Sequence, residues 1–309
     1  MSVVAELQQL RKTPKGERRK NKDNLPGHLF LLPWTVGLFG ITLFPMAASL
    51  YLAFTDYNLL QSPEWIGIDN ITRMISDDRL HNSLQVTFTY VFIGVPIQLA
   101  VSLAIAMLLD RGMRALPFYR SVFYLPSMLG ASVAIAVLWR QIFGYSGLIN
   151  QLLEMVGIEG RGWVSSPDTA LATLIILHVW TFGAPMVIFL AGLRQIPDMF
   201  YEAASIDGAS RFKQFFTITI PLLTPIIFFN LVLQLIGAFQ NFTQAFVVSG
   251  GTGGPADSTL FYTLYLYQQG FNRFDMGYAS AMAWLLVLII SAITVVNFWL
   301  SKYWVHYDD

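Results

Sequence analysis

The chain has 309 residues, of which 55% are hydrophobic and only 12% are charged, and its formal net charge is +0. Ordinary soluble domains carry about 25% charged residues, so the composition excludes that class of protein. The chain contains no cysteine, which excludes disulfides, cysteine-ligated zinc and thiol catalysis.

The N-terminal tail, residues 1–28, is strongly basic and precedes the first apolar block. Such a tail is typical of a topology signal that is also attracted to anionic lipid. We therefore expect membrane lipid as its partner, and we do not favour the alternative of a nucleic-acid-binding patch. The apolar block that follows exceeds the about 7–15 residues of a signal-peptide core, so it is expected to be retained.

Six apolar blocks follow the tail, and each is long enough for the about 20 helical residues that cross a bilayer. They are Leu29–Phe54, Leu84–Leu109, Ser121–Phe143, Ala170–Leu193, Pro221–Phe242 and Gly277–Leu300. No charged residue lies well inside any of them. The sequence predicts an all-α, polytopic membrane protein with six transmembrane helices in one domain, residues 29–306.

Basic residues concentrate in the tail, in the second and fourth loops and after the last block. The positive-inside rule therefore predicts that both termini, including residues 307–309, lie in the cytoplasm. The first, third and fifth loops are then predicted to face outward.

The fourth loop, residues 194–220, reads as two short helices around a glycine. Asp198 is a candidate N-cap for the first helix, and Gly208 suits the left-handed residue that ends it. Ser210 caps the second helix, and Pro221 is expected in the first turn of the fifth span. Isolated helices this short are marginal in water, so the loop is predicted either to dock on a soluble partner or to lie on lipid.

The fifth span carries four amide side chains at positions i, i+4, i+11 and i+14. They are Asn230, Gln234, Asn241 and Gln244. On one continuous helix, at about 100° per residue, they fall on one stripe. Amides donate and accept hydrogen bonds, as a neutral polyhydroxylated solute requires. The alternative is that they only join helices to one another.

Nearby side chains add weaker candidates for a solute site. Phe239 and Phe242 offer flat surfaces for a sugar ring, and Trp180, Thr181 and Gly183 lie in the fourth span. These residue types in a span are also typical of helix packing.

The remaining polar motifs do not predict catalysis, a metal or a cofactor. The glycine-rich stretch Gly250–Pro255 lacks the following Gly-Lys-Ser/Thr of a phosphate-binding loop. If ATP drives transport, another polypeptide therefore supplies the ATPase. His178 lies deep in the fourth span, where it is either a proton relay or a hydrogen-bonding group between helices or along a pathway.

The fourth loop contains Glu202-Ala203-Ala204, Asp207-Gly208-Ala209 and Ile218–Pro221 in order. With these motifs the chain resembles the inner-membrane permease subunits of binding-protein-dependent ABC importers, which are type I importer permeases. Further segments resemble the carbohydrate-uptake branch, with its maltose-permease-like and glycerol-phosphate-permease-like subunits. These segments are Phe118–Pro126, Gly147–Asn150 and Gly277–Ala283.

The resemblance implies partners and roles. A second permease would complete a heterodimer, two cytoplasmic ATPase subunits would supply energy, and an extracytoplasmic binding protein would deliver the solute, all at the cell membrane of a prokaryote. The implied ATPase-coupling residues are Glu202, Ala203, Ala204, Asp207, Gly208 and Ala209. Sugar binding in maltose-permease-like relatives corresponds here to Gln240 and Asn241.

The sequence therefore predicts a permease subunit, without an ATPase site of its own, of an ATP-driven importer for oligosaccharides or related sugars. Three alternatives remain: an ion-coupled secondary carrier subunit, an ABC importer permease for a non-sugar solute such as a glycerol phosphate, and an assembly subunit that does not touch the solute.

Overall fold

The computed structural model describes residues 24–110, 115–130 and 132–306, with side chains from residue 29 onward. The predicted cytoplasmic tail lies mostly outside these ranges, and the predicted C-terminal residues 307–309 lie entirely outside them. The chain divides into two units, Met1–Tyr51 and Leu52–Asp309.

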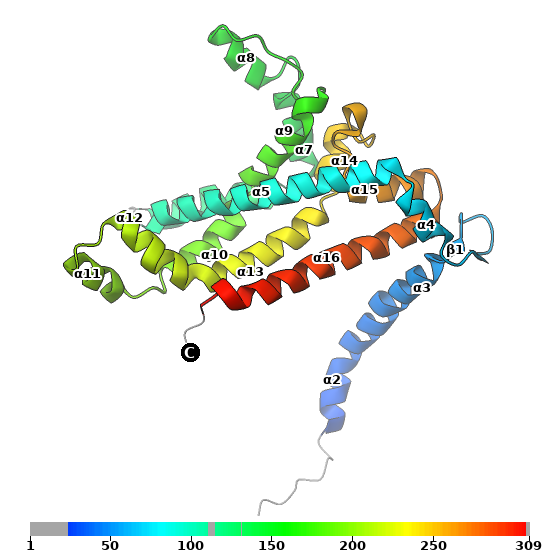
Figure 1. Cartoon of the computed structure of the whole chain (residues 1–309), viewed down its shortest axis with the longest axis horizontal. Helices are drawn as coiled ribbons and strands as arrows, with labels where there is room; N and C mark the ends of the chain where they lie inside the picture. Colours follow the sequence, from blue (N-terminus) through cyan, green and yellow to red (C-terminus); the bar gives the residue numbers. More distant parts are fainter. Residues whose placement is uncertain (1–23, 111–114, 131, 307–309) are drawn as a thin grey trace, which may run out of the picture. The chain divides into compact units, whose positions relative to one another are not determined.

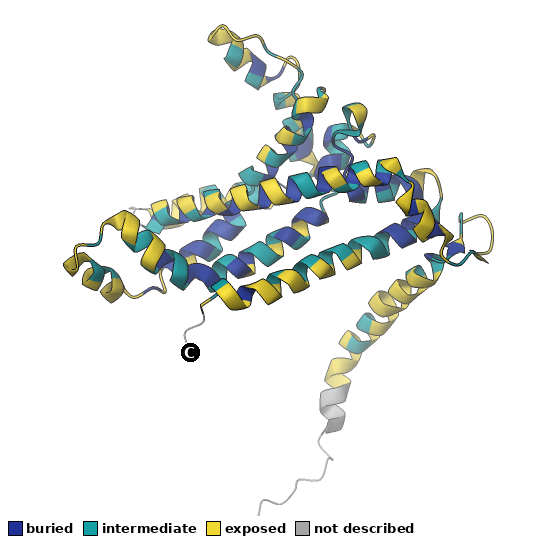
Figure 2. Cartoon of the chain, viewed as in Figure 1, coloured by how far each residue is buried: buried dark blue, intermediate teal, exposed yellow. Residues whose placement is uncertain are grey.

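The described part of the first unit is one helix that continues into Leu52. It comprises α2 (Asn24–Val36), the π-helical η1 (Gly37–Leu43) and α3 (Phe44–Leu52). Its apolar stretch Leu29–Leu52 is long enough to cross a membrane and has no buried residue in its most hydropathic window. Exposed colouring accordingly runs along this helix in Figure 2.

The second unit is helical apart from one small hairpin. Its elements are β1 (Thr55–Asp56), β2 (Glu64–Trp65), α4 (Asp69–Ile75), α5 (Asp78–Asp110), α6 (Leu116–Leu129), α7 (Val133–Ile142), α8 (Leu148–Met155), α9 (Pro167–Trp180), α10 (Gly183–Leu193), α11 (Asp198–Ile206), α12 (Arg211–Gln214), η2 (Phe215–Thr219), α13 (Ile220–Phe239), α14 (Thr243–Ser249), η3 (Pro255–Asp257), α15 (Tyr262–Tyr267), η4 (Gln268–Asn272) and α16 (Met276–Trp304). The strands pair antiparallel, with Thr55 opposite Trp65.

Helix α5 is the centre of the second unit, because α9, α10, α13 and α15 all pack against it. Its residues Val91, Val95 and Ala106 are fully buried. Figure 1 shows α5, α13 and α16 running in similar directions, and buried residues concentrate on α10 and α13 in Figure 2.

The predicted all-α membrane fold is confirmed, although two of the predicted spans are broken. Four helices are long and apolar enough to cross a membrane: Leu29–Leu52, Asp78–Asp110, Arg211–Phe239 and Met276–Trp304. The other two predicted spans are the bent pairs α6–α7, at 93°, and α9–α10, at 41°. The described residues therefore contain up to six spans when each bent pair counts as one.

The predicted fifth span, Pro221–Phe242, agrees with α13 at its start and is wrong at its end. Pro221 lies in the first turn of α13, as expected, and α13 ends at Phe239. The whole helix is longer, because α12 and η2 continue into α13 and extend it back to Arg211. Ser210 caps it as expected, since its Oγ accepts a hydrogen bond from the Lys213 N–H at 3.3 Å. Proline cannot donate to the turn before it, and the π-helical segment η2, just before Pro221, changes the bonding there so that the helix continues.

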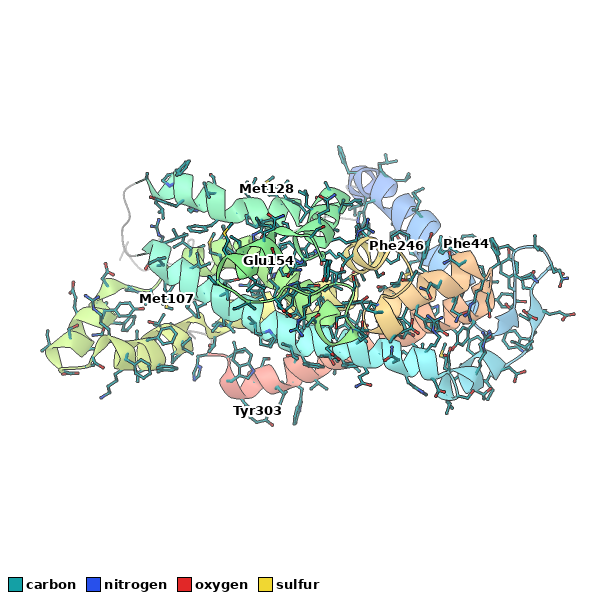
Figure 3. All side chains as sticks on the ribbon, turned by 90° about the horizontal axis from the view of Figure 1, so that it is seen from above. Phe44, Met107, Met128, Glu154, Phe246 and Tyr303 are labelled. Atoms are coloured by element: carbon teal, nitrogen blue, oxygen red, sulfur yellow. The ribbon has the colours of Figure 1, made fainter. Side chains whose placement is uncertain are left out.

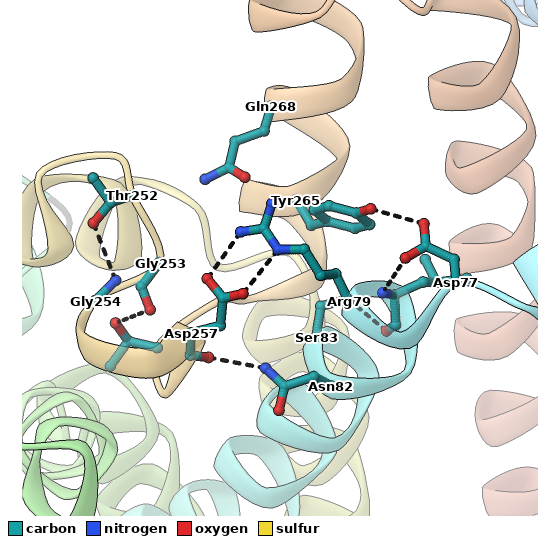
Figure 4. A network of polar contacts seen from close by, with 12 residues as sticks. Asp77, Arg79, Asn82, Ser83, Thr252, Gly253, Gly254, Asp257, Tyr265 and Gln268 are labelled. Atoms are coloured by element: carbon teal, nitrogen blue, oxygen red, sulfur yellow. Dashed lines mark hydrogen bonds and ion pairs between the residues drawn. The ribbon is translucent and has the colours of Figure 1, made fainter.

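A polar network holds the start of α5 to the loop after α14 and to α15 (Figure 4). Arg79 donates to both carboxylate oxygens of Asp257 at 2.8 Å. Asp77 accepts from the hydroxyls of Tyr265 and Tyr278 at 2.7 Å. Burial alone would raise the pKa of Asp77, but these hydrogen bonds and those from backbone N–H groups hold it below its usual value.

Candidate functional site

Two regions of the second unit hold the residues that the sequence singles out. We call Asp198–Thr219, which contains α11, α12 and η2, the coupling segment. We call a cavity of about 290 Å³ between α5, the α9–α10 break and the α13–α14 break the polar pocket. In Figure 1, α11 and α12 lie at one end of the long helices, and α14 lies toward the other end.

The coupling segment follows the predicted pattern with one correction. Pro197, and not Asp198, is the N-cap of α11, so Asp198 lies in the first turn, where an acidic side chain suits the helix dipole. Gly208 adopts the predicted left-handed conformation, with φ of 75°.

Two backbone hydrogen bonds complete the end of α11. The Ala209 N–H donates to the Ala204 carbonyl at 2.9 Å, and the Gly208 N–H donates to the Ser205 carbonyl at 3.1 Å. Together they form a Schellman motif, which turns the chain sharply after the helix. The Gly208-Ala209 pair of the sequence motif therefore turns the chain so that α12 runs back toward α11.

Side-chain hydrogen bonds hold α11 against the start of the long helix that contains α13. Gln214 Nε2 donates to Ser205 Oγ at 2.9 Å and to the Ala209 carbonyl at 3.1 Å. The hydroxyls of Tyr201 and Thr219 share a hydrogen bond of 2.9 Å. These bonds join α11 to the helix that follows.

The outer surface of the coupling segment is exposed and partly apolar. Ile206 is 87% exposed and Phe212 is 75% exposed. Glu202, Ala203 and Asp207 are exposed as well, whereas Ala204 and Ala209 are half-buried. Such a surface at one end of the long helices of the second unit is typical of a protein-binding site.

The polar pocket lies where helices break. Its lining residues are Tyr90, His178, Thr181, Gln234, Gly237, Ala238, Gln240, Asn241, Phe242, Thr243 and Gln244. The α9–α10 break falls at Thr181, and the α13–α14 break falls at residues 240–242. Within a bilayer, irregular backbone is tolerated where it is buried in protein or lines a cavity, so these breaks identify a place where a solute can meet polar groups.

Asn241 joins three elements at the pocket. Its Nδ2 donates to the Tyr90 hydroxyl at 2.8 Å and to Gln244 Oε1 at 3.2 Å. Its carbonyl accepts from Thr263 Oγ1 at 2.6 Å. Gln244 Nε2 in turn donates to the Gly130 carbonyl at 2.8 Å, at the end of α6. These bonds fix the amide positions that face the pocket.

Polar side chains satisfy the freed backbone groups of the α9–α10 break. Gln98 Nε2 donates to the carbonyls of His178 and Thr181, each at 3.1 Å. Ser127 Oγ also donates to the Thr181 carbonyl, at 2.8 Å. The break is therefore a stable feature of the helix and not a distortion at a surface.

The structure brings four of the predicted amide side chains to the pocket, namely Gln234, Gln240, Asn241 and Gln244. The predicted single stripe is wrong, because the helix ends at Phe239 and helical spacing does not extend to Asn241 and Gln244. Asn230 lies elsewhere: it is buried, and its Nδ2 donates to the Ile226 carbonyl at 3.1 Å.

The aromatic and glycine candidates of the fourth and fifth spans have packing positions. The ring centroids of Trp180 and Trp139 lie 6.0 Å apart, and Phe239 is buried. At Gly183, a Cβ atom would come within 2.5 Å of the Phe123 carbonyl oxygen, so glycine allows α10 to approach α6 closely. Phe242 and Thr181, in contrast, line the pocket.

Sequence reasoning missed Tyr90 and Gln98. Tyr90 reaches the pocket from α5, and a polar group inside an apolar block was the only signal for either residue. His178 lines the pocket with its ring 5.1 Å from Tyr90, and its Nε2 has no hydrogen-bond partner among the described residues. No described cluster of three or more His, Asp or Glu side chains is arranged to hold a metal ion.

Comparisons with known proteins agree with this architecture. Residues 82–305 match the family described as "binding-protein-dependent transport system inner membrane component". The chain is 53% identical, over 96% of both chains, to the probable ABC transporter permease protein YesP of Bacillus subtilis (strain 168). It is 31% identical to the lactose transport system permease protein LacF of Rhizobium radiobacter, over 89% of this chain and 94% of that protein.

A solved structure supports the fold. A chain of a bacterial alginate ABC transporter, in complex with an alginate pentasaccharide-bound periplasmic protein, matches with a TM-score of 0.78 at 18% identity. The match covers 90% of this chain and 94% of that chain. From the family match and the relatives together, the chain belongs to the family of inner-membrane components of binding-protein-dependent transport systems, a family of ABC importer permeases and not of enzymes.

Proposed function

We propose that this chain is a permease subunit of an ATP-driven importer for oligosaccharides or related sugars. The observation that carries the proposal is the polar pocket, whose described lining contains amides, hydroxyls and the imidazole of His178 but no Asp, Glu, Lys or Arg. The names of several relatives agree, since they refer to transport of lactose, trehalose or maltose, and arabinooligosaccharides. A lining without Lys or Arg favours sugars over an anionic glycerol phosphate.

The amides of Gln234, Gln240, Asn241 and Gln244 would hydrogen-bond the sugar hydroxyls, and Phe242 would pack against the apolar face of a ring. Asn230, Trp180 and Gly183 would act only indirectly, through packing. The pocket volume, about 290 Å³, is at the lower limit of ligand sites. This supports a pathway shared with a second permease, which would supply the remaining contacts.

The coupling segment would dock on one of two ATPase subunits, with Glu202, Ala203, Ala204, Asp207, Gly208 and Ala209 at the contact. Its exposed apolar side chains, Ile206 and Phe212, support such an interface. The helix Arg211–Phe239 has 29 residues, so it extends for about 42 Å. It begins within the coupling segment and ends at the edge of the polar pocket. Movement of α11 would thereby change the pocket.

The position of the coupling segment also bears on the orientation that we propose for the chain in the membrane. The chain lies in the cell membrane with both termini and the coupling segment in the cytoplasm, as the basic loops indicate. A solute-binding protein would then deliver the sugar at the opposite end of the molecule, near α4 and α15.

Reconstitution tests this function. The complex purified from its native host would be placed in liposomes with ATP inside and the cognate binding protein outside. Radiolabelled lactose, maltose, trehalose and arabinotriose would be offered in turn. We expect uptake of at least one sugar that requires both ATP and the binding protein. Uptake driven by an ion gradient without ATP, or uptake of none of the four sugars, would contradict the proposal.

A further inference from the structure

Four aromatic side chains form an unbroken series of ring contacts that starts at the polar pocket. Phe242 lines the pocket, and its ring centroid lies 5.3 Å from that of Phe246 and 5.2 Å from that of Tyr267. Tyr267 lies 5.6 Å from Phe246 and stacks on Phe271, with centroids 5.1 Å apart and ring planes within 23°. We call these four residues the aromatic track.

Exposure rises along the aromatic track away from the pocket. Phe242, Phe246 and Tyr267 are half-buried, and Phe271 is 57% exposed. The neighbouring core ring of Phe261 is 1% exposed. A cluster that served only the core would be covered in the same way, so the track is a surface feature that begins inside the pocket.

The aromatic track runs from the α13–α14 break, which contains Phe242, over α14, α15 and η4, at the end of α13 that is remote from the coupling segment (Figure 1). Figure 3 shows Phe246 on α14. The four side chains carry no charge, and the loop beside them is held in place because Gln268 Nε2 donates to the Gly251 carbonyl at 2.8 Å. The surface is therefore uncharged, largely apolar and continuous with the pocket through Phe242.

We propose that the aromatic track is a sliding surface along which the rings of an incoming sugar reach the polar pocket. The inference deepens the proposed function and rests on it. A sugar ring has an apolar face of C–H groups, which packs on an aromatic ring while the hydroxyls at its edge stay hydrated. Such contact has no fixed hydrogen-bond geometry, so a ring passes from one aromatic side chain to the next without breaking a directional bond.

Alanine substitutions at the exposed part of the aromatic track test the inference. In the reconstituted complex, Tyr267→Ala and Phe271→Ala should each lower the initial uptake rate by about 3- to 10-fold at low loaded binding protein, as loss of one aromatic contact predicts. The probe is whichever of lactose, maltose, trehalose and arabinotriose the unmodified complex imports. Tyr267→Phe and Phe271→Tyr, which keep the ring, should stay within about twofold of wild type.

A second exposed ring pair provides a matched control. Trp299 and Tyr303 on α16 have centroids 5.6 Å apart and are 56% and 74% exposed, but neither lines the pocket. Trp299→Ala and Tyr303→Ala should leave uptake unchanged. Stimulation of ATPase activity by the binding protein should also be unchanged in the track variants.

Three results would overturn the inference, and they differ from one another. Unchanged uptake in both track alanine variants would show that the rings do not guide the sugar. Loss of the second permease on copurification of these variants would assign the rings to a contact between subunits. Failure of the wild-type complex to import any of the four sugars would contradict the proposed function itself.

Discussion

The coupling segment is held by hydrogen bonds between residues close in sequence, whereas the polar pocket depends on bonds between distant parts of the chain. The Gln214–Ser205 bond spans nine residues. The Asn241–Tyr90 and Gln244–Gly130 bonds span 151 and 114 residues. A locally bonded segment can move as one body, while a pocket assembled from several helices changes shape when those helices shift. We therefore expect coupling variants to abolish energy transfer and pocket variants to change solute recognition.

The largest effect is expected at Gly208. A Cβ atom added there meets no neighbouring atom within 4 Å, but the φ of 75° is strained for a β-branched residue such as valine. The strain should open the Schellman turn and displace α11, so that ATP-driven uptake falls by at least about 100-fold, while membrane insertion is retained. Uptake in liposomes measures the loss of transport, and immunoblotting of membranes measures membrane insertion.

Gly208→Asn is the matched control, because asparagine tolerates the left-handed conformation. It should retain most of the uptake. Full uptake by Gly208→Val would show that the turn is not needed for coupling.

Asn241→Ala should weaken solute recognition without uncoupling ATP hydrolysis. The substitution removes the Nδ2 that contacts Tyr90 and Gln244. We expect the KM for sugar uptake to rise by about 10-fold, as for the loss of one or two hydrogen bonds of about 1 kcal/mol each. Asn230→Ala is the control, since the Nδ2 of Asn230 donates to the Ile226 carbonyl in its own helix and Asn230 lies outside the described pocket lining. An equal rise of the KM in both variants would contradict a specific role of Asn241 in solute recognition.

Gly183→Ala tests whether long-range packing supports the pocket. The added Cβ would lie 2.5 Å from the Phe123 carbonyl oxygen, so α6 and α10 would have to separate. We expect destabilisation of about 1–3 kcal/mol, seen as a lower melting temperature of the purified complex. Gly237→Ala, at a glycine with no atom within 4 Å of the added Cβ, should not destabilise it. Equal melting temperatures for the two variants would contradict close α6–α10 contact.

The smallest effect is expected at Asp77, in the polar network outside the spans. Its folded pKa lies below the unfolded value of about 3.9. The stability that it contributes is therefore present above about pH 4 and is lost as pH falls through the lower folded pKa. The melting temperatures of wild type and Asp77→Asn should differ at pH 7, and the difference should shrink in acid. A constant difference between pH 7 and pH 3 would contradict this assignment.

These contrasts also explain how much the sequence predicted. The cap at Ser210 and the left-handed Gly208 follow from neighbouring residues, so local rules sufficed. The break after Phe239 and the approach of Tyr90 to Asn241 depend on how α5, α9 and α13 pack, which no local rule contains. The prediction of a single stripe of amides was wrong for this reason. Gln234 and Asn241 do meet at the pocket, but they are brought together by a break in the helix and not by helical periodicity.

One paired measurement tests the central claim most directly: sugar uptake and binding-protein-stimulated ATPase activity, both in the reconstituted complex, for Gly208→Val and Asn241→Ala. We predict that Gly208→Val loses both activities, because in the proposed function the ATPase acts on the helix Arg211–Phe239 through the turn at Gly208. Asn241→Ala should keep the stimulated ATPase activity and show a raised KM for uptake. An Asn241→Ala complex with wild-type KM, or a Gly208→Val complex with wild-type uptake, would contradict the account.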